Sequence, residues 1–401
     1  MKLHKLTIRD VPLEHKKVLI RVDYNVPLDD KGNIDDDFRI KSSLPTIRYL
    51  LDLGCTLVLI SHLGRPNGAE KKFSLEPAAQ RLAELLGQDV RFVDQCTGDK
   101  ARQAVRRAPK GSITVLENLR FHTEEEANDD AFAAELRQVS GADYFVQDGF
   151  GVVHRAHAST DAITHHLPSV AGLLLEKEYT SITGAMKRPE RPLVAVLGGA
   201  KVSDKIELVD QFINQADKIL LGGAMANTFL HGKGVDVGES KIEPGQEETV
   251  AKIVANAEKK STSLLHFPTD VAVGHSLDDK RRVVATDKIA SDDKVFDVGD
   301  VTIDDYVDIV RSAGTVIWNG TLGVAEYEEF AHGSARLALE LASNSKVTSV
   351  IGGGDTADFV LHWDSKDGES FTHVSTGGGA SLELMAGDKL PGIESLLAGK
   401  K

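Results

Sequence analysis

The chain alternates short apolar runs, rich in β-branched residues, with amphipathic segments of helical period. Apolar runs of this length are typical of buried parallel strands, and the amphipathic segments, such as residues 75–87 and 248–260, have the length of crossover helices. We therefore predict an α/β fold with open, doubly wound parallel sheets, whose functional residues follow the strands. The apolar runs cover residues 17–25, 56–64, 112–120, 143–151, 192–200, 218–226, 263–273, 314–320 and 347–354.

The middle of the chain departs from this alternation. Residues 166–192 contain one long amphipathic stretch that ends in Lys-Arg-Pro-Glu-Arg-Pro, a sequence that cannot remain helical. Because 401 residues exceed one ordinary core, we expect two domains, over residues 1–170 and 171–388. The second begins with the connecting helix and hinge. The tail, residues 389–401, is expected to pack back on the first domain.

Composition narrows the class of protein. The formal net charge of −14 argues against a nucleic-acid-binding surface, and no apolar run approaches the roughly 20 residues that span a bilayer. The first 17 residues lack the apolar core of a signal peptide. Only Cys55 and Cys96 are present, too few for a disulfide framework or a cysteine-built zinc site. We therefore expect a cytoplasmic protein with no membrane or nucleic-acid partner.

The first apolar run has an unusual polar pattern. Arg21, Asp23 and Asn25 alternate with apolar residues, which places these three side chains on one face of a strand. An edge strand with one solvated face would give the same pattern. The run alone does not separate a functional face from a solvated one.

Cationic residues recur after successive strands of the first half. His62 lies near the end of the second run and Arg65 just after it, Arg120 ends the third, and Arg155 follows the fourth, while Arg39 lies in a segment between the first two. Arginine is the side chain best suited to bidentate contacts with phosphate and carboxylate. Carboxyl ends of parallel strands share one edge of a sheet, so these residues predict a basic pocket in an acidic protein.

His154 and His157 have a spacing that would also suit metal ligands. The carboxylate of an HExxH-like motif is missing, and Arg155 between the two histidines would oppose a cation. A metal site at this position is therefore the less favoured interpretation.

Lysine and glycine mark the second half. Lys201 and Lys205 lie four residues apart, which on a helix places both on one face, although a solvated lysine pair is the alternative. The pattern G-x-x-x-x-G-K-[ST] is absent, so this segment is not a P-loop. Small residues at Gly222–Gly223 and Asn319–Gly320, with Gly323 and Glu326 beyond, would let a flat ring or a ribose approach the backbone.

Two triple-glycine turns precede the last helical segments. Residues 352–354 are followed directly by Asp355, and residues 377–379 open another amphipathic segment. Glycine turns at helix starts expose backbone N–H groups that suit phosphate. A carboxylate would repel that phosphate unless a metal ion lay between them, so the turn at Asp355 predicts both a phosphate and a metal.

Taken in order, these segments resemble the phosphoglycerate kinase family from about residue 18 to residue 392. The motifs that carry the resemblance are RVDYNVP (21–27), SHLGRP (61–66), LENLRF (116–121), HRAHAS (154–159), LGGAKVSDK (197–205), WNG (318–320), GGGDT (352–356) and STGGGASLEL (375–384). The resemblance implies two Rossmann-like domains in a monomeric chain, joined by a hinge. It implies reversible phosphoryl transfer between 1,3-bisphosphoglycerate and Mg-ADP, giving 3-phosphoglycerate and Mg-ATP.

The resemblance also implies roles for single residues. The phosphoglycerate set in the first domain is Asp23, Asn25, Arg39, His62, Arg65, Arg120 and Arg155. The nucleotide set in the second domain is Gly199, Lys201, Lys205, Gly223, Asn319, Glu326, Gly353, Gly354, Asp355 and Thr356. Asp355 is the implied magnesium ligand. The implied catalytic residues are Arg39, Lys205, Gly354 and Gly378.

The chain departs from the family pattern at several positions. Thr321, Leu322 and Ala325 replace the family's usual Pro, Met or Pro, and Phe, and Ala224 replaces a common third glycine. Gln147, Gly149 and residues 152–153 also differ from the usual Asn, Ala and Thr-Ala or Ser-Ala. None of these changes removes a charged catalytic group. They bear on the fit around the base and the ribose and on the geometry between the domains.

Phosphoryl transfer depends on alignment and charge neutralisation rather than on covalent help. Our hypothesis is that Arg39 and Lys205 converge on the moving phosphoryl group when the two domains close. Two alternatives stay open. One is a catalytically silent two-domain protein that binds a phospho-ligand or nucleotide. The other, an NAD-dependent dehydrogenase, lacks G-x-G-x-x-G after the first strand.

Overall fold

The structure is a computed structural model that describes residues 2–29 and 31–399, so residues 1, 30, 400 and 401 of the expected domains lie outside it. The chain forms two compact units, Met1–Thr180 with Lys389–Lys401, and Ser181–Asp388. The division falls within helix α6 (Leu173–Lys187). The C-terminal segment belongs to the first unit, where the Leu6 amide donates to the Leu397 carbonyl at 2.9 Å.

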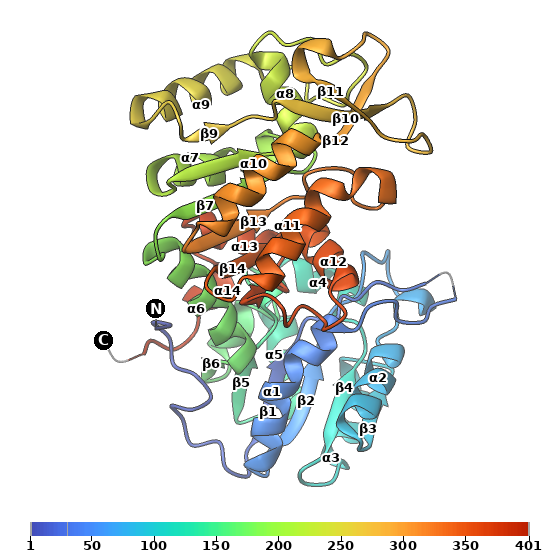
Figure 1. Ribbon diagram of the computed structural model, residues 1–401. Helices are drawn as coiled ribbons and strands as arrows, with labels where there is room; N and C mark the ends of the chain where they lie inside the picture. Colours follow the sequence, from blue (N-terminus) through green and yellow to red (C-terminus); the bar gives the residue numbers. More distant parts are fainter. Residues whose placement is uncertain (1, 30, 400–401) are drawn as a thin grey trace. The chain divides into compact units, whose positions relative to one another are not determined.

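A six-stranded, fully parallel sheet forms the centre of the first unit (Figure 1). The strands, in spatial order, are β3 (Val90–Val93), β4 (Ile113–Leu116), β2 (Thr56–Ile60), β1 (Lys17–Arg21), β5 (Tyr144–Gln147) and β6 (Ser169–Ala171). The main helices are α1 (Phe38–Asp52), α2 (Glu76–Leu86), α3 (Gly98–Arg106) and α5 (Asp130–Ser140), with the short helices α4 (Thr123–Glu126) and α14 (Pro391–Glu394). Helices α1 and α2 pack side by side, and α3 packs against α5.

Strand β1 is a central strand with both faces buried. It pairs in parallel with β2 on one side and β5 on the other. Val18 and Ile20 join the core that includes residues of α1 and α2, whereas Leu19 joins the core that includes residues of α3 and α5. The interpretation of this run as an edge strand with a solvated face is therefore wrong. Arg21 is 1% exposed and Asp23 is 7% exposed.

The second unit contains another six-stranded parallel sheet and a small antiparallel one. The parallel strands, in spatial order, are β15 (His373–Val374), β14 (Thr348–Gly352), β13 (Thr315–Asn319), β7 (Leu193–Leu197), β8 (Lys218–Leu221) and β9 (Leu265–His266). The antiparallel sheet has the order β11 (Arg282–Ala285), β10 (Asp270–Gly274) and β12 (Lys294–Val298). The sequence did not predict this second sheet. Residues 263–273, expected to be one strand, form parts of two strands in different sheets because Phe267, Pro268 and Thr269 separate them.

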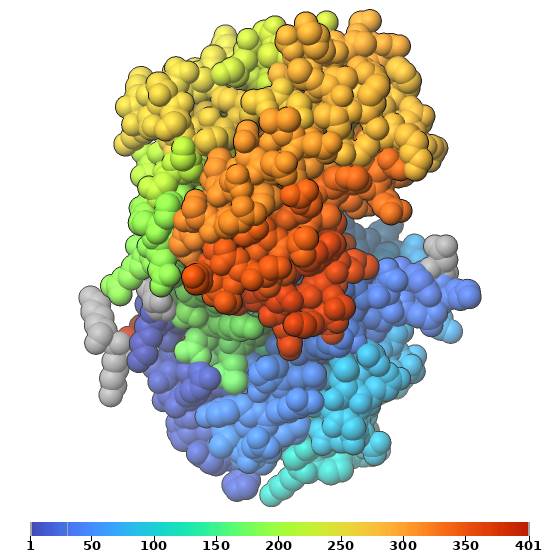
Figure 2. Space-filling view, in the orientation of Figure 1, coloured from blue at the N-terminus to red at the C-terminus, as the bar shows by residue number. Residues whose placement is uncertain are grey.

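Seven helices of this unit lie wholly within the described residues: α7 (Ile206–Gln215), α8 (Gly223–Gly232), α9 (Glu247–Lys260), α10 (Asp300–Arg311), α11 (His332–Ser343), α12 (Gly354–Trp363) and α13 (Gly379–Ala386). The yellow residues of α9 and the amber residues of the antiparallel sheet lie at the same end of this unit (Figure 2). Trp318 of β13 is fully buried, and its indole N–H donates to the Gly320 carbonyl at 2.8 Å.

The two parallel α/β sheets confirm the predicted fold class. Long apolar runs with crossover helices specify buried parallel strands because both faces of such a sheet must be covered. Among the helices of residues 2–29 and 31–399, none is both long and apolar enough to cross a membrane.

Gly320 provides a test of how closely the backbone packs after β13. Its φ is 103°, and an added Cβ would lie 2.2 Å from the Gly198 carbonyl oxygen. Gly245 has a φ of 77° with open space around its Cβ position, so Gly245→Ala reports the conformational cost alone. We expect Gly320→Ala to lower the melting temperature by roughly 3–10 °C more than Gly245→Ala does, as overpacking costs about 1–3 kcal/mol. Equal melting temperatures by calorimetry would contradict the steric account.

Candidate active site

The first unit gathers cationic side chains where its strands end. Asp23 and Asn25 follow β1, His62 and Arg65 follow β2, Arg120 lies in a 3₁₀ turn (Leu119–Phe121) after β4, and Arg155 follows β5. Arg39 lies in the first turn of α1. Parallel strands deliver all these residues to one edge of the sheet.

Hydrogen bonds tie three of these loops together. The Arg39 guanidinium lies 3.2 Å from the Asp23 carboxylate and donates to the Asn25 carbonyl at 2.8 Å. The Asn25 side chain accepts from the Gly64 amide at 2.8 Å, and the Gly64 carbonyl accepts from Arg120 at 2.8 Å. The loops after β1, β2 and β4 and the start of α1 are therefore one connected group.

The electrostatics of this group are dominated by arginine. Burial lowers the pKa of Arg120, and nearby Arg155 and Arg65 lower it further, while Glu126, with its carboxylate at 3.1 Å, raises it. The pKa of His62 lies well below its ordinary value because the ring is buried among the positive charges of Arg21, Arg120, Arg39 and Arg155. His62 is therefore neutral at pH 7, and the positive charge of the group is carried by its arginines.

His154 and His157 lie within the same positive field. Burial is the main cause that lowers the pKa of each to about 4, and Arg155 adds to it. Arg155 donates through Nε to His154 Nε2 at 3.1 Å. With that nitrogen engaged and cations around it, this pair is a poor metal site, as expected from Arg155 in the sequence. The His154 Nδ1 atom is buried with no hydrogen-bond partner among the described residues.

Lys205 is the central cation of the second unit. Its ammonium donates to the Gly198 carbonyl at 2.6 Å and to the Asn319 carbonyl at 3.1 Å. Burial lowers its pKa to about 8, and Asp355 and Asp204 partly oppose that shift. Lys201 and Lys205 do not share a helix face, contrary to the prediction. Lys201 lies in the loop before the 3₁₀ turn Ser203–Lys205, and α7 begins only after that turn.

Backbone segments approach closely around Gly223. A Cβ on Gly223 would lie 2.8 Å from the Gly199 amide nitrogen and 3.0 Å from the Thr321 carbonyl oxygen. The Gly223 amide donates to the Leu322 carbonyl, and the Met225 amide donates to the Gly199 carbonyl. A small pocket adjoins these turns, lined by Gly223, Ala226, Asn227, Pro268, Val271, Val295, Phe296, Asp297, Val298 and Leu322. The glycines predicted to face the nucleotide base are thus brought together beside a largely apolar pocket.

The triple-glycine turn after β14 lies against Asn319. Gly353 has a φ of 88°, and a Cβ added to it would lie 3.1 Å from Asn319 Nδ2. That Nδ2 is buried and has no hydrogen-bond partner among the described residues. Thr356 Oγ1 accepts from the Gly320 amide at 2.6 Å, which joins α12 to the end of β13. This corner therefore offers an unused donor beside the N-terminus of α12.

Other predicted nucleotide residues are exposed. Asp355 lies in the first turn of α12, and Gly354 before it has open space around its Cβ position. Gly378, with φ 48°, precedes the start of α13. Lys201 and Glu326 are exposed. An exposed carboxylate next to helix N-termini fits magnesium, which binds through one or two carboxylates, waters and phosphate.

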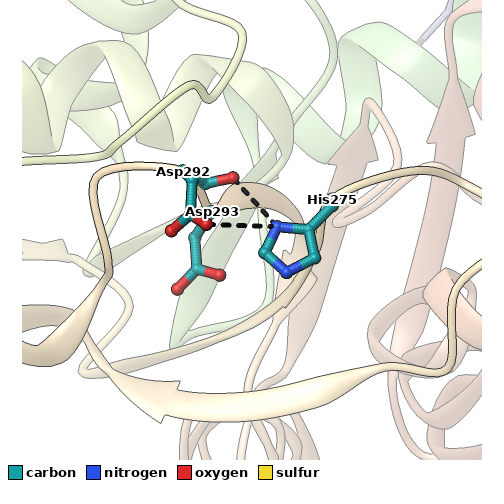
Figure 3. Close-up of side chains that lie close together, drawn as sticks. All are labelled: His275, Asp292 and Asp293. Atoms are coloured by element: carbon teal, nitrogen blue, oxygen red, sulfur yellow. Dashed lines mark hydrogen bonds and ion pairs between the residues drawn. The ribbon is translucent and has the colours of Figure 1, made fainter.

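A different cluster in the second unit has the ligand types of a metal centre. Within the described residues, only His275, Asp292 and Asp293 bring ligand atoms of this kind within 4.8 Å of one another (Figure 3). The Asp293 carboxylate, however, is fully buried and already accepts from Arg282 and from the Ala290 amide. Because a guanidinium occupies that carboxylate, the cluster is satisfied without a metal.

The site residues predicted from the sequence did not include three residues that lie beneath the cationic group around His62. Arg21, Glu125 and Ser159 form a buried chain of hydrogen bonds under the cationic loops. The alternation in RVDYN placed Arg21 on the face of Asp23, and Ser159 ends the motif HRAHAS. Glu125 stands among three consecutive glutamates, so its burial had no signal in the sequence.

Comparisons with known proteins give a single result. Residues 8–388 match the sequence model of the family described as phosphoglycerate kinase. The chain is 48% identical to the phosphoglycerate kinase of Chloroflexus aurantiacus over 98% of its length and 99% of the relative. It is 45% identical to that of Akkermansia muciniphila, with 98% of both chains covered.

Solved structures agree with the sequence relatives. The phosphoglycerate kinase of Coxiella burnetii is similar with a TM-score of 0.84 at 34% identity, and that of Pyrococcus horikoshii with a TM-score of 0.85 at 32% identity. Each comparison covers 98% of both chains. Because the family model matches residues 8–388 and these relatives are covered over nearly their whole length, the chain belongs to the phosphoglycerate kinase family.

Proposed function

We propose that this protein is a phosphoglycerate kinase, which transfers a phosphoryl group reversibly between 1,3-bisphosphoglycerate and Mg-ADP to give 3-phosphoglycerate and Mg-ATP. The observation that carries the proposal is the cationic group of the first unit, in which the loops after three strands are joined around Asn25 and Gly64. Such a group in a protein of net charge −14 is an anion site rather than a general surface property.

We assign the phosphoglycerate to the first unit. Its carboxylate or acyl phosphate and its 3-phosphate are all anionic, and planar guanidinium groups bind such groups bidentately. The neutral His62 adds a hydrogen-bond donor without adding charge. The residues proposed to contact this ligand are Asp23, Asn25, Arg39, His62, Arg65, Arg120 and Arg155.

We assign the nucleotide to the second unit. The turns at Gly199 and Gly223 would receive the base beside the apolar pocket, and Glu326 would accept from the ribose. Lys201, Lys205, Asn319, Gly353, Gly354 and Thr356 would surround the phosphates. Asp355 would hold the magnesium ion, which when bound neutralises phosphate charge.

The chemistry requires positioning and charge neutralisation but no general base, since the acceptor oxygen is already an anion. We propose that Arg39 and Lys205 both act on the transferring phosphoryl group. Backbone N–H groups at Gly354 and Gly378, each at the N-terminus of a helix, would add fixed dipoles. Exclusion of water would protect the acyl phosphate from hydrolysis. We further infer a hinge-bending monomer in the cytoplasm.

The proposal has one principal test. Purified protein should form 1,3-bisphosphoglycerate from 3-phosphoglycerate and Mg-ATP in a coupled assay, and chelation of magnesium should abolish turnover. Lys205→Ala should lower kcat by at least about 100-fold, because removal of one transition-state donor costs about 2.7–4 kcal/mol. Lys252→Ala, which changes an exposed lysine of α9, is the matched control. Binding of both ligands without turnover would instead support the silent binding protein.

Arg65 provides a test of the phosphoglycerate assignment. This side chain is exposed, and its charge acts on Arg120. We expect Arg65→Gln to raise KM for 3-phosphoglycerate about tenfold or more, as one charge-assisted hydrogen bond contributes about 1.5–3 kcal/mol. KM for Mg-ATP should stay within about twofold of the wild type. Arg107→Gln, at an exposed position after α3, is the control. A loss of kcat with unchanged KM would contradict the assignment.

Lys205 also predicts a pH dependence. Its pKa of about 8 means that the free protein loses this cation as the pH rises through 8. The value of kcat/KM for Mg-ATP, which reports the free enzyme, should therefore fall about tenfold per pH unit above that point. Lys205→Arg keeps its charge to much higher pH, so its residual activity should lack this alkaline decline. A wild-type profile that is flat to pH 10 would show that Lys205 is not the responsible group.

A further inference from the structure

Arg21 is the most deeply buried cation of the first unit, at 1% exposure. Its Nε atom donates to Ser159 Oγ at 2.7 Å, and its Nη1 atom donates to the Val22 carbonyl. Its Nη2 atom lies 3.1 Å from His62 Nδ1. A guanidinium has donors only, so His62 Nδ1 is the acceptor of this bond. The neutral imidazole must then carry its proton on Nε2.

Glu125 supplies the counter-charge for Arg21. It has no exposed surface, and it accepts from the Ser159 hydroxyl at 2.5 Å and from the Ser159 amide at 3.0 Å. The single hydroxyl proton of Ser159 is directed to Glu125, which leaves the oxygen free to accept from Arg21. Arg21 therefore donates both to His62 Nδ1 and to Ser159 Oγ, and the Ser159 hydroxyl donates to Glu125.

Charge complementarity supports this arrangement. Burial raises the pKa of Glu125 and lowers that of Arg21, and in each case the charge of the partner is the strongest influence that opposes the shift. Two buried opposite charges are stable only when both are hydrogen-bonded. The Ala158 amide also donates to the Glu125 carbonyl at 2.9 Å, so the backbone of α4 is fixed to the same segment as Ser159.

We propose that Glu125, Ser159 and Arg21 are positioning residues that hold His62 in the Nε2–H tautomer, so that the imidazole presents a hydrogen-bond donor to the anionic phosphoglycerate. The opposite tautomer would present a lone pair to a negative ligand. This role of His62 rests on the proposed function, whereas the tautomer itself is a property of the free protein.

The direct test is NMR spectroscopy of the free protein labelled with ¹⁵N at histidine. The chain has 14 histidines, and the spectrum of His62→Gln identifies the signals of His62. At pH 7 we expect an unprotonated Nδ1 and a protonated Nε2. A ring protonated on Nδ1, or on both nitrogens, overturns the proposal. This measurement needs no substitution of Arg21, Ser159 or Glu125 and no catalytic turnover.

Variants of Ser159 and Glu125, which with Arg21 form the hydrogen-bonded relay behind His62, extend the test. Ser159→Ala removes the hydroxyl between Arg21 and Glu125, so His62 should show a mixture of tautomers, and KM for 3-phosphoglycerate should rise about fivefold to tenfold. KM for Mg-ATP should stay within about twofold. Ser159→Thr keeps a hydroxyl and should restore the single tautomer. Glu125→Gln keeps an acceptor but removes the charge, and it should give an intermediate effect on both readouts.

Ser140→Ala is the matched control, since it removes another fully buried serine hydroxyl of the same unit, one that donates to the Arg137 carbonyl. It should change neither the tautomer nor either KM. A single Nε2–H tautomer that persists in folded Ser159→Ala would overturn the positioning role. Absence of turnover in the wild type, with the expected tautomer present, would instead overturn the proposed function and leave the relay standing.

Discussion

The first unit depends on the confinement of several positive charges at one edge of a buried sheet. Like charges at short range repel strongly, and burial removes the water that would screen them. The structure tolerates this because three of these cations are individually compensated. Arg39 lies against Asp23, Arg120 against Glu126, and Arg21 is linked to Glu125. The histidines within the same field have depressed pKa values and add no further charge.

The second unit brings its strand-end loops together by a different means. Its described loops converge through glycine, so that backbone rather than side chains forms the site around Gly199, Gly223 and Gly353. Lys205 is held by two carbonyl oxygens, and its burial weakens its hold on the proton. A negative charge such as a phosphate beside this ammonium would raise its pKa again, because the negative charge stabilises the protonated form.

The charged loops of the first unit and the glycine turns of the second both follow from the topology of parallel sheets. Every strand of such a sheet ends at the same edge, and each crossover helix begins just after the strand-end loop. In the first unit that edge collects long charged side chains from β1, β2, β4 and β5. In the second it collects glycine turns and the N-termini of α12 and α13. The antiparallel sheet of β10, β11 and β12 contributes its own satisfied ion pair, between Arg282 and Asp293.

The sequence by itself determined the fold class and the family. Apolar runs with amphipathic crossovers specify parallel strands, and the order of the strand-end motifs specifies which residues gather at the strand ends. It also placed Asp23, Asn25, His62 and Arg120 in one group, because equivalent ends of parallel strands must meet.

Tertiary structure decided the features that depend on partners distant in the chain. Nothing in three consecutive glutamates marks Glu125 as the buried one; its burial follows from the packing of α4 against Ser159. The helical period suggested one face for Lys201 and Lys205, but a 3₁₀ turn intervenes and only Lys205 is drawn against β13. Local sequence specifies period and chain direction, whereas burial, charge compensation and proton position arise only when separate segments come into contact.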